Sequence, residues 1–347
     1  MTARRTIIRK VPQLEQFCST KKYVLCNTSN AFVPRMGGVT SNVTRRLMKT
    51  SHEADFLRAL YQAWSDRMAA NPTLTIADLR SLFEEWHQPT LEPEGVTYQS
   101  KAVAGVESIW ALPVGADASK VILYTHGGGF AVGSAASHRK LAGHLAKHLG
   151  VVAAVIDYRR APEHPFPAQI EDSTAVYREL LALGFEPQDI TICGDSAGGN
   201  LAIATVLKLR DDGVALPGAV IVFSPWLDME HVGKTLETNH ATDALLNKTI
   251  LEGLSDMFLG ENGSRTNPLA NPLKADYCGF PRLYIAAGSV ETLLDNATDL
   301  ADIAREAGVS VALSVVDGMQ HVFPVLAGRA VEADEELRRI AKWFKDA

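Results

Sequence analysis

The most reactive arrangement in the sequence is a serine flanked by glycines. Ser196 lies in the hexapeptide GDSAGG at 194–199, between an apolar segment ending at Cys193 and a helix-forming pattern at 200–209. In this strand-turn-helix context, G-x-S-x-G is typical of a nucleophile elbow, whose tight turn requires small residues two positions before and after the serine. The neighbouring Asp195 is expected to hold the turn by hydrogen bonds. The pentapeptide alone also fits a serine that caps a helix in a glycine-rich turn.

A second glycine-rich loop, HGGGF at 126–130, directly follows the apolar segment 121–125. Backbone N–H groups in such a loop can point together at a developing oxyanion, and glycine lets the backbone approach a substrate closely. Spacing excludes a phosphate-binding loop, because no G-K-[ST] follows and Val132 stands where G-x-G-x-x-G needs its last glycine. A plain glycine turn remains an alternative. Together, the two loops indicate acyl-transfer chemistry.

A serine hydroxyl is a weak nucleophile unless a base removes its proton, and the elbow motif expects the chain order serine, acid, histidine. Three histidines follow Ser196. His231 and His240 fall in or beside the segment 231–259, which interrupts the strand and helix alternation. His321 lies in a loop just after a strand pattern and is the predicted general base. Without the two glycine-rich loops it would be interpreted as a surface histidine.

Three carboxylates compete as the acid of the triad. Glu291 follows an apolar strand pattern and precedes His321 by 30 residues. It is the favoured acid, because either Asp or Glu can orient the histidine. Asp295 is its rival, and Asp317, four residues before the histidine, is a more distant one. A carboxylate at a helix start also complements the helix dipole, which suits Asp295 better than Glu291.

Four sequence blocks, taken together, resemble the hormone-sensitive-lipase-like esterases, also called bacterial family IV esterases and lipases. The blocks are HGGGF at 126–130, DYRRAPEHPFPA at 157–168, GDSAGGN at 194–200 and SPWLD at 224–228. The resemblance covers approximately residues 95–345. It implies an α/β-hydrolase fold, a helical cap built largely from the N-terminal segment, and cofactor-free hydrolysis of short to medium acyl esters.

The same resemblance assigns further site residues. The oxyanion donors should be the amides of Gly128, Gly129 and Ala197, with Gly127 as a neighbouring candidate. Many of these relatives carry aspartate in a D-x-L pattern at the position of Glu291, so the glutamate is a departure whose extra methylene the loop must absorb.

Short β-branched segments alternate with helical patterns from about residue 96 onward, which is typical of βαβ units and a mostly parallel sheet. The expected strands lie at 96–99, 107–111, 121–125, 151–156, 189–193, 219–223, 282–286 and 311–316. The expected helices lie at 138–149, 170–183, 199–210, 293–307 and 331–344. We predict an α/β-hydrolase catalytic domain at 95–347, with helices flanking a mostly parallel central sheet.

Two segments do not follow this alternation and are the candidate cap. Residues 1–94 contain a stretch at 27–44 rich in Asn, Ser, Thr and Gly, followed by helical patterns at 53–70 and 76–86. The other is 231–259. Segments of this kind can lie over the C-terminal edge of the sheet, where open α/β sheets bind ligands. At helical spacing, the aromatic residues of the first segment are more typical of a core than of a pocket. They are Phe56, Tyr61, Trp64, Phe83 and Trp86.

Composition excludes several kinds of partner. The net charge of -6, from 34 basic and 40 acidic residues, provides no basic stripe for nucleic acid and no polybasic membrane patch. The sequence has no signal-peptide h-region and no run of 18 apolar residues, so we expect a cytoplasmic protein without a membrane span. Four cysteines without C-x-x-C spacing favour reduced thiols.

Three histidines on one helical pattern raise the question of a metal site. His144 and His148 are spaced i, i+4, and His138 lies near them. Leucines at helical spacing mark the buried face of this helix, which predicts that His144 and His148 lie on its polar face. We therefore expect no metal site here, and the family resemblance implies that no cofactor is needed.

The sequence as a whole predicts a serine carboxylester hydrolase that acts on short to medium acyl esters or lactones through an acyl-enzyme. Its partner would be a small-molecule ester or lactone, and a homodimer is compatible with the sequence. The alternatives are a lactone-specific hydrolase, a non-catalytic ligand-binding protein on the same fold, which the presence of His321 disfavours, and an acyltransferase or amidase with the same triad. Substrate identity depends on the cap, because the triad processes only the carbonyl.

Overall fold

The computed structural model describes residues 50–71 and 73–346, and the stretch at 27–44 lies outside them. The described chain contains an eight-stranded sheet in the order β1-β2-β4-β3-β5-β6-β7-β8. The strands are β1 Val96–Ser100, β2 Ser108–Pro113, β3 Asp117–Thr125, β4 Val151–Ile156, β5 Ile190–Asp195, β6 Ala219–Phe223, β7 Arg282–Gly288 and β8 Val311–Val316. Strands β3 to β8 are all parallel to one another. At one edge of the sheet, β1 pairs antiparallel with β2, and β2 pairs antiparallel with β4.

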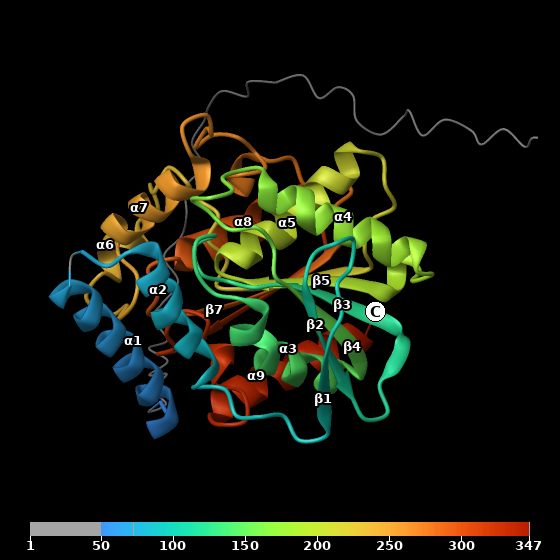
Figure 1. Ribbon diagram of the computed structural model, residues 1–347, viewed down its shortest axis with the longest axis horizontal. Helices are drawn as coiled ribbons and strands as arrows, with labels where there is room; N and C mark the ends of the chain where they lie inside the picture. Colours follow the sequence, from blue (N-terminus) through green and yellow to red (C-terminus); the bar gives the residue numbers. More distant parts are fainter. Residues whose placement is uncertain (1–49, 72, 347) are drawn as a thin grey trace, which may run out of the picture. The chain divides into compact units, whose positions relative to one another are not determined.

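Helices cover both faces of this sheet. They are α3 Ala135–Leu149, α4 Ala168–Ala182, α5 Ala197–Asp211, α8 Leu294–Glu306 and α9 Val331–Lys345. Figure 1 shows α3 and α9 on one face and α4, α5 and α8 on the other. Every residue of β4 and β6 is buried, which explains why these strands are continuous apolar runs in the sequence.

The remaining helices gather at one end of the sheet (Figure 1). They are α1 His52–Ala70, α2 Ile76–Phe83, α6 Thr235–Thr238 and α7 Lys248–Leu259. The described chain also contains the short 3-10 turns η1 Glu84–His87, η2 Pro187–Asp189, η3 Pro272–Lys274 and η4 Phe323–Leu326. Ser65 of α1 donates a hydrogen bond of 2.7 Å to the carbonyl of Ala244. Helix α1 and the segment 231–259, both predicted from the sequence to belong to the cap, are thus in contact.

All eight predicted strands are present, and β4, β6 and β8 have the predicted bounds. Helix α3 begins three residues before the predicted position 138, because Ser134 caps it by accepting the N–H of Ser137. The helix predicted over 76–86 ends at Phe83 and continues as η1. In the described part of the chain, no helix is both long and apolar enough to cross a bilayer.

The prediction that His144 lies on the polar face of its helix is wrong. Its side chain is buried, and Nε2 lies 2.9 Å from the carbonyl oxygen of Leu91. The chain between η1 and β1 runs across this face of α3, where Lys140 donates to the carbonyls of His87 and Thr90. A long-range contact of this kind leaves no trace in the periodicity of the helix itself.

Candidate active site

Ser196 lies in the sharp turn between β5 and α5. Its φ of 53° falls in the left-handed region that non-glycine residues rarely adopt. Flanking glycines make this turn sterically feasible, because a Cβ on Gly194 would overlap the carbonyl of Gly198, and one on Gly198 would overlap the carbonyl of Thr125. The small residues predicted at these two positions are therefore a steric requirement of the elbow.

The loop after β3 presents free backbone donors. Gly128 has a φ of 112°, and a Cβ there would overlap a backbone carbonyl, so only glycine fits. Among the described residues, the N–H groups of Gly128 and Gly129 have no protein acceptor. In contrast, the N–H of Gly127 donates to Asp195 Oδ1 at 3.2 Å and is already engaged in holding the loop. Ala197 begins α5, where an N–H has no acceptor within the helix.

Asp195 holds the loop after β3 through its carboxylate. Its carboxylate is buried, and Oδ1 accepts a second hydrogen bond, of 2.8 Å, from the hydroxyl of Tyr124. Oδ2 lies 3.3 Å from His138 Nε2. Burial raises the pKa of Asp195, but the charge of His138 and these hydrogen bonds lower it more, so the group stays ionised. The expected hydrogen-bonding role of Asp195 is confirmed.

His321 and Glu291 come together from two neighbouring strand ends. Glu291 follows β7, His321 follows β8, and Glu291 Oε2 lies 2.9 Å from His321 Nδ1. Both side chains are buried. Burial raises the pKa of Glu291 above its ordinary value, although the hydrogen bond and charge of His321 oppose this. Burial lowers the pKa of His321, but the hydrogen bond and charge of Glu291 outweigh it, so the net pKa is raised above 6.5.

The two rival carboxylates have other partners. Asp295 Oδ2 accepts the backbone N–H of Thr235 at 2.8 Å. Asp317 Oδ1 accepts the hydroxyl of Ser289 at 3.1 Å. Of the three carboxylates named from the sequence, the structure brings only Glu291 to the histidine.

Two further residues support this pair and were not found from the sequence. The hydroxyl of Tyr61, in α1, donates to the carbonyl of His321 at 2.9 Å. Asp243 is buried, and its Oδ2 accepts both the N–H and the hydroxyl of Thr292, at 2.8 and 2.9 Å, which fixes the residue next to Glu291. No local pattern marks either residue, because each contact joins distant parts of the chain.

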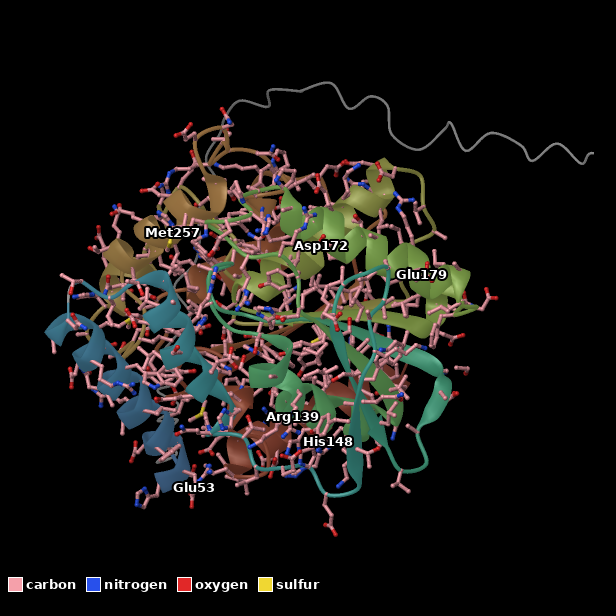
Figure 2. The ribbon with its side chains drawn as sticks, viewed as in Figure 1. Glu53, Arg139, His148, Asp172, Glu179 and Met257 are labelled. Carbon is pink, nitrogen blue, oxygen red and sulfur yellow. The ribbon has the colours of Figure 1, made fainter. Side chains whose placement is uncertain are left out.

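A cavity of about 290 Å³ contains Ser196 and His321 in its wall, together with Gly128 and Gly129. Within the described residues, the serine hydroxyl makes no direct hydrogen bond to the histidine, and such catalytic contacts commonly tighten only when substrate is bound. The rest of the wall is largely apolar and comes mainly from α2 and from residues 245–257, which include most of α7, while α1 contributes Met68. Met257, labelled on α7 in Figure 2, is one of these residues.

The aromatic residues of the N-terminal helices divide between core and cavity. Tyr61 and Trp64 are fully buried core residues, as the helical spacing predicts. Trp86 is also buried in the core, Phe83 packs against the core, and both side chains line the cavity as well. Phe56 is 38% exposed, with the guanidinium of Arg329 above its ring. The interpretation of these residues as core is thus correct for only part of the set.

The described residues contain no group of three or more His, Cys, Asp or Glu side chains placed to hold a metal ion. His138 instead stacks on Trp86, with ring centroids 5.7 Å apart, and faces Asp195. His148, labelled on α3 in Figure 2, is half-buried.

Comparison with known proteins identifies the family of this chain. A family model described as alpha/beta hydrolase fold matches residues 122–325. An acetyl-hydrolase of Streptomyces hygroscopicus is 40% identical over 67% of this chain and 79% of that protein. An esterase of Acinetobacter venetianus is 34% identical over 73% of this chain and 84% of that protein.

A solved structure extends the match to most of the described residues. The crystal structure of an esterase from the bacterial hormone-sensitive lipase family has a TM-score of 0.81 and 38% identity, covering 86% of this chain and 99% of that one. The chain therefore belongs to the α/β-hydrolase fold family, among its hormone-sensitive-lipase-like esterases.

Proposed function

We propose that this esterase is a serine carboxylester hydrolase with Ser196 as nucleophile, His321 as general base and Glu291 as the orienting carboxylate. The observation that carries the proposal is the 2.9 Å contact between His321 Nδ1 and Glu291 Oε2, with Ser196 and His321 in the wall of one cavity. When Nδ1 donates to Glu291, Nε2 is the nitrogen left to accept the serine proton. A protein that only binds ligands has no need of this arrangement.

In the acylation step, Ser196 Oγ attacks the ester carbonyl carbon while His321 accepts the hydroxyl proton. The proposed donors to the resulting oxyanion are the N–H groups of Gly128, Gly129 and Ala197, because those of Gly128 and Gly129 are unengaged and that of Ala197 begins a helix. The bond to the alcohol oxygen then breaks, and His321 gives its proton to the leaving alcohol.

In the deacylation step, water attacks the acyl-enzyme carbonyl and His321 accepts its proton. The bond to Ser196 Oγ breaks, the proton returns to the serine, and the carboxylic acid leaves. A lactone would follow the same course, except that its leaving alcohol remains part of the acyl group until deacylation.

We propose that α1, α2 and α7 form the cap and select the acyl group. Among the described residues, the cavity wall contains Leu79, Phe83, Leu254 and Met257 and no Asp, Glu, Lys or Arg side chain. An uncharged, short to medium acyl group fits such a wall, because an unpaired charge would lose its hydration there.

Hydrolysis of p-nitrophenyl butyrate by the full chain tests the proposed function. We expect a kcat within the usual enzyme range of roughly 1 to 10³ s⁻¹. A panel that adds ethyl butyrate and a six-membered lactone then compares linear with cyclic esters. Saturable binding of these esters without turnover would instead support a non-catalytic ligand-binding protein.

A charged acyl terminus should be rejected. We expect kcat/KM for monomethyl adipate to fall at least about 100-fold below that for methyl hexanoate, because the apolar wall offers the carboxylate no partner. Titration of released acid in a pH-stat measures both rates. Comparable rates for the two esters would show that the acyl group does not enter this cavity.

The pH dependence should follow the ionisation of His321. The base acts only when neutral, and its pKa is raised above 6.5 by Glu291, so kcat/KM should fall as pH drops through a midpoint above 6.5. Initial rates from pH 5 to 9 measure this limb. A flat profile over that range would contradict the assignment of the base.

A further inference from the structure

The loop 126–130, which follows β3 and carries two of the proposed oxyanion donors, is called the oxyanion loop. Helix α7 contacts this loop at two adjacent residues. A Cβ on Gly129 would lie 2.6 Å from Leu254 Cδ1 and 2.7 Å from Cδ2, so the leucine methyls lie directly against the glycine backbone. One residue further along the loop, the ring of Phe130 stacks on Phe258 with centroids 3.8 Å apart and planes inclined by 10°. The side chains that reach the loop are one helical turn apart on α7.

The stacked loop residue has an unfavourable backbone conformation. Phe130 has a φ of 62°, in the left-handed region that disfavours side chains with a Cβ. Its ring is buried between Phe258 and Trp226, and its carbonyl accepts the N–H of Ala161 at 2.9 Å. Packing against α7 therefore holds the loop in a conformation that this residue does not favour by itself.

Helix α7 also lines the cavity that contains Ser196 and His321, called the acyl cavity because the acyl group is proposed to bind there. Leu254 and Met257 both line it, and Leu254 also abuts Gly129. The far end of α7 is fixed, because the carbonyl of Phe258 accepts the N–H of Phe166 at 2.7 Å. An acyl chain in the cavity thus contacts one side of Leu254, and the other side of that residue contacts the backbone that carries an oxyanion donor.

We propose that α7 couples occupancy of the acyl cavity to the position of the oxyanion donors, through Leu254 and Phe258 as positioning residues. This inference rests on the proposed serine hydrolase function. A longer acyl chain keeps Leu254 pressed against Gly129 and so holds the amides where negative charge develops. Its binding energy is then expressed in kcat rather than in KM, because the contact matters most in the transition state.

The experiment measures kcat and KM separately for p-nitrophenyl acetate, butyrate, hexanoate and octanoate. For the natural sequence, we expect kcat to rise roughly tenfold from acetate to hexanoate, while KM changes less. Leu254→Ala should make kcat nearly independent of chain length, and Leu254→Met should restore the rise. Phe258→Leu should lower kcat for every ester by about 10- to 100-fold with little change in KM, as loss of an oxyanion donor does.

A matched control comes from the same cavity. Leu246 also lines it, but the atoms nearest to a Cβ on Gly128 or Gly129 belong to Val132, Gly133 and Leu254, so Leu246→Ala should raise KM for the longer esters and keep the dependence of kcat on chain length. Thermal melting and active-site titration with a phosphonate ester correct each rate for the folded, active fraction.

Two results would overturn the coupling. If Leu254→Ala raises KM uniformly and keeps the rise in kcat, Leu254 is only a wall of the cavity. If Phe258→Leu leaves kcat unchanged, the stacking on Phe130 does not position the loop. In both cases ester hydrolysis dependent on Ser196 would persist, whereas absence of hydrolysis in the natural sequence would refute the proposed function itself.

Discussion

Replacing Ser196 with alanine should lower kcat for p-nitrophenyl butyrate by roughly 10⁵- to 10⁶-fold, because the proposed acyl-enzyme forms on the serine hydroxyl oxygen, which alanine lacks. The fold should persist, since the change removes one oxygen atom at the cavity wall. Stopped assays with a high enzyme concentration measure the residual rate, and circular dichroism checks the fold.

Ser119→Ala provides the matched control for this prediction. Ser119 is exposed, and its hydroxyl bonds only to the nearby Asp117, so its replacement should leave kcat and KM unchanged. Residual activity above one per cent in Ser196→Ala would place the nucleophile elsewhere.

Replacing Glu291 with glutamine should lower kcat by about 10³- to 10⁴-fold, because the amide cannot stabilise the imidazolium and can hold the ring in the wrong tautomer. The same change should move the acid limb of kcat/KM to lower pH. The midpoint moves to lower pH because the carboxylate of Glu291 raises the pKa of His321 in the natural protein, whereas an uncharged amide would not raise it. Partial unfolding would lower the rate but would not move the pH midpoint of kcat/KM, so the two effects together identify the lost carboxylate.

Asp295→Asn is the control that separates the two candidate acids. Asp295 is engaged with the N–H of Thr235, 60 residues away in the sequence, and makes no hydrogen bond to His321 among the described residues. Its replacement should change kcat by less than about tenfold and leave the pH midpoint in place. A larger loss in Asp295→Asn than in Glu291→Gln would reverse the assignment of the acid.

The sheet could be predicted because its signals are local. The runs at 151–156 and 219–223 are apolar throughout, and the structure buries every residue of β4 and β6. Ser196 could be found for a similar reason, because the glycines that its turn requires lie within two residues of it. The buried strands and the serine turn could therefore be predicted from residues that are close together in the sequence.

The support around the catalytic pair could not be predicted, because it depends on contacts between distant segments. Tyr61 and His321 are 260 residues apart, and Asp243 and Thr292 are 49 apart. The sequence favoured Glu291 over Asp295, although both follow the same strand, and the structure places only the Glu291 carboxylate beside His321. A cytoplasmic location and a homodimer stay predictions from the sequence.

Covalent trapping of the nucleophile tests the central claim most directly. A p-nitrophenyl alkylphosphonate should transfer its phosphonyl group to Ser196 Oγ with release of p-nitrophenol, since the tetrahedral product resembles the intermediate stabilised by the oxyanion donors. Mass spectrometry of the digested protein should find one adduct, on the peptide that contains Ser196, with its yield equal to the fraction of activity lost. Inactivation with the adduct on any other residue, or full activity with Ser196 modified, would contradict the account.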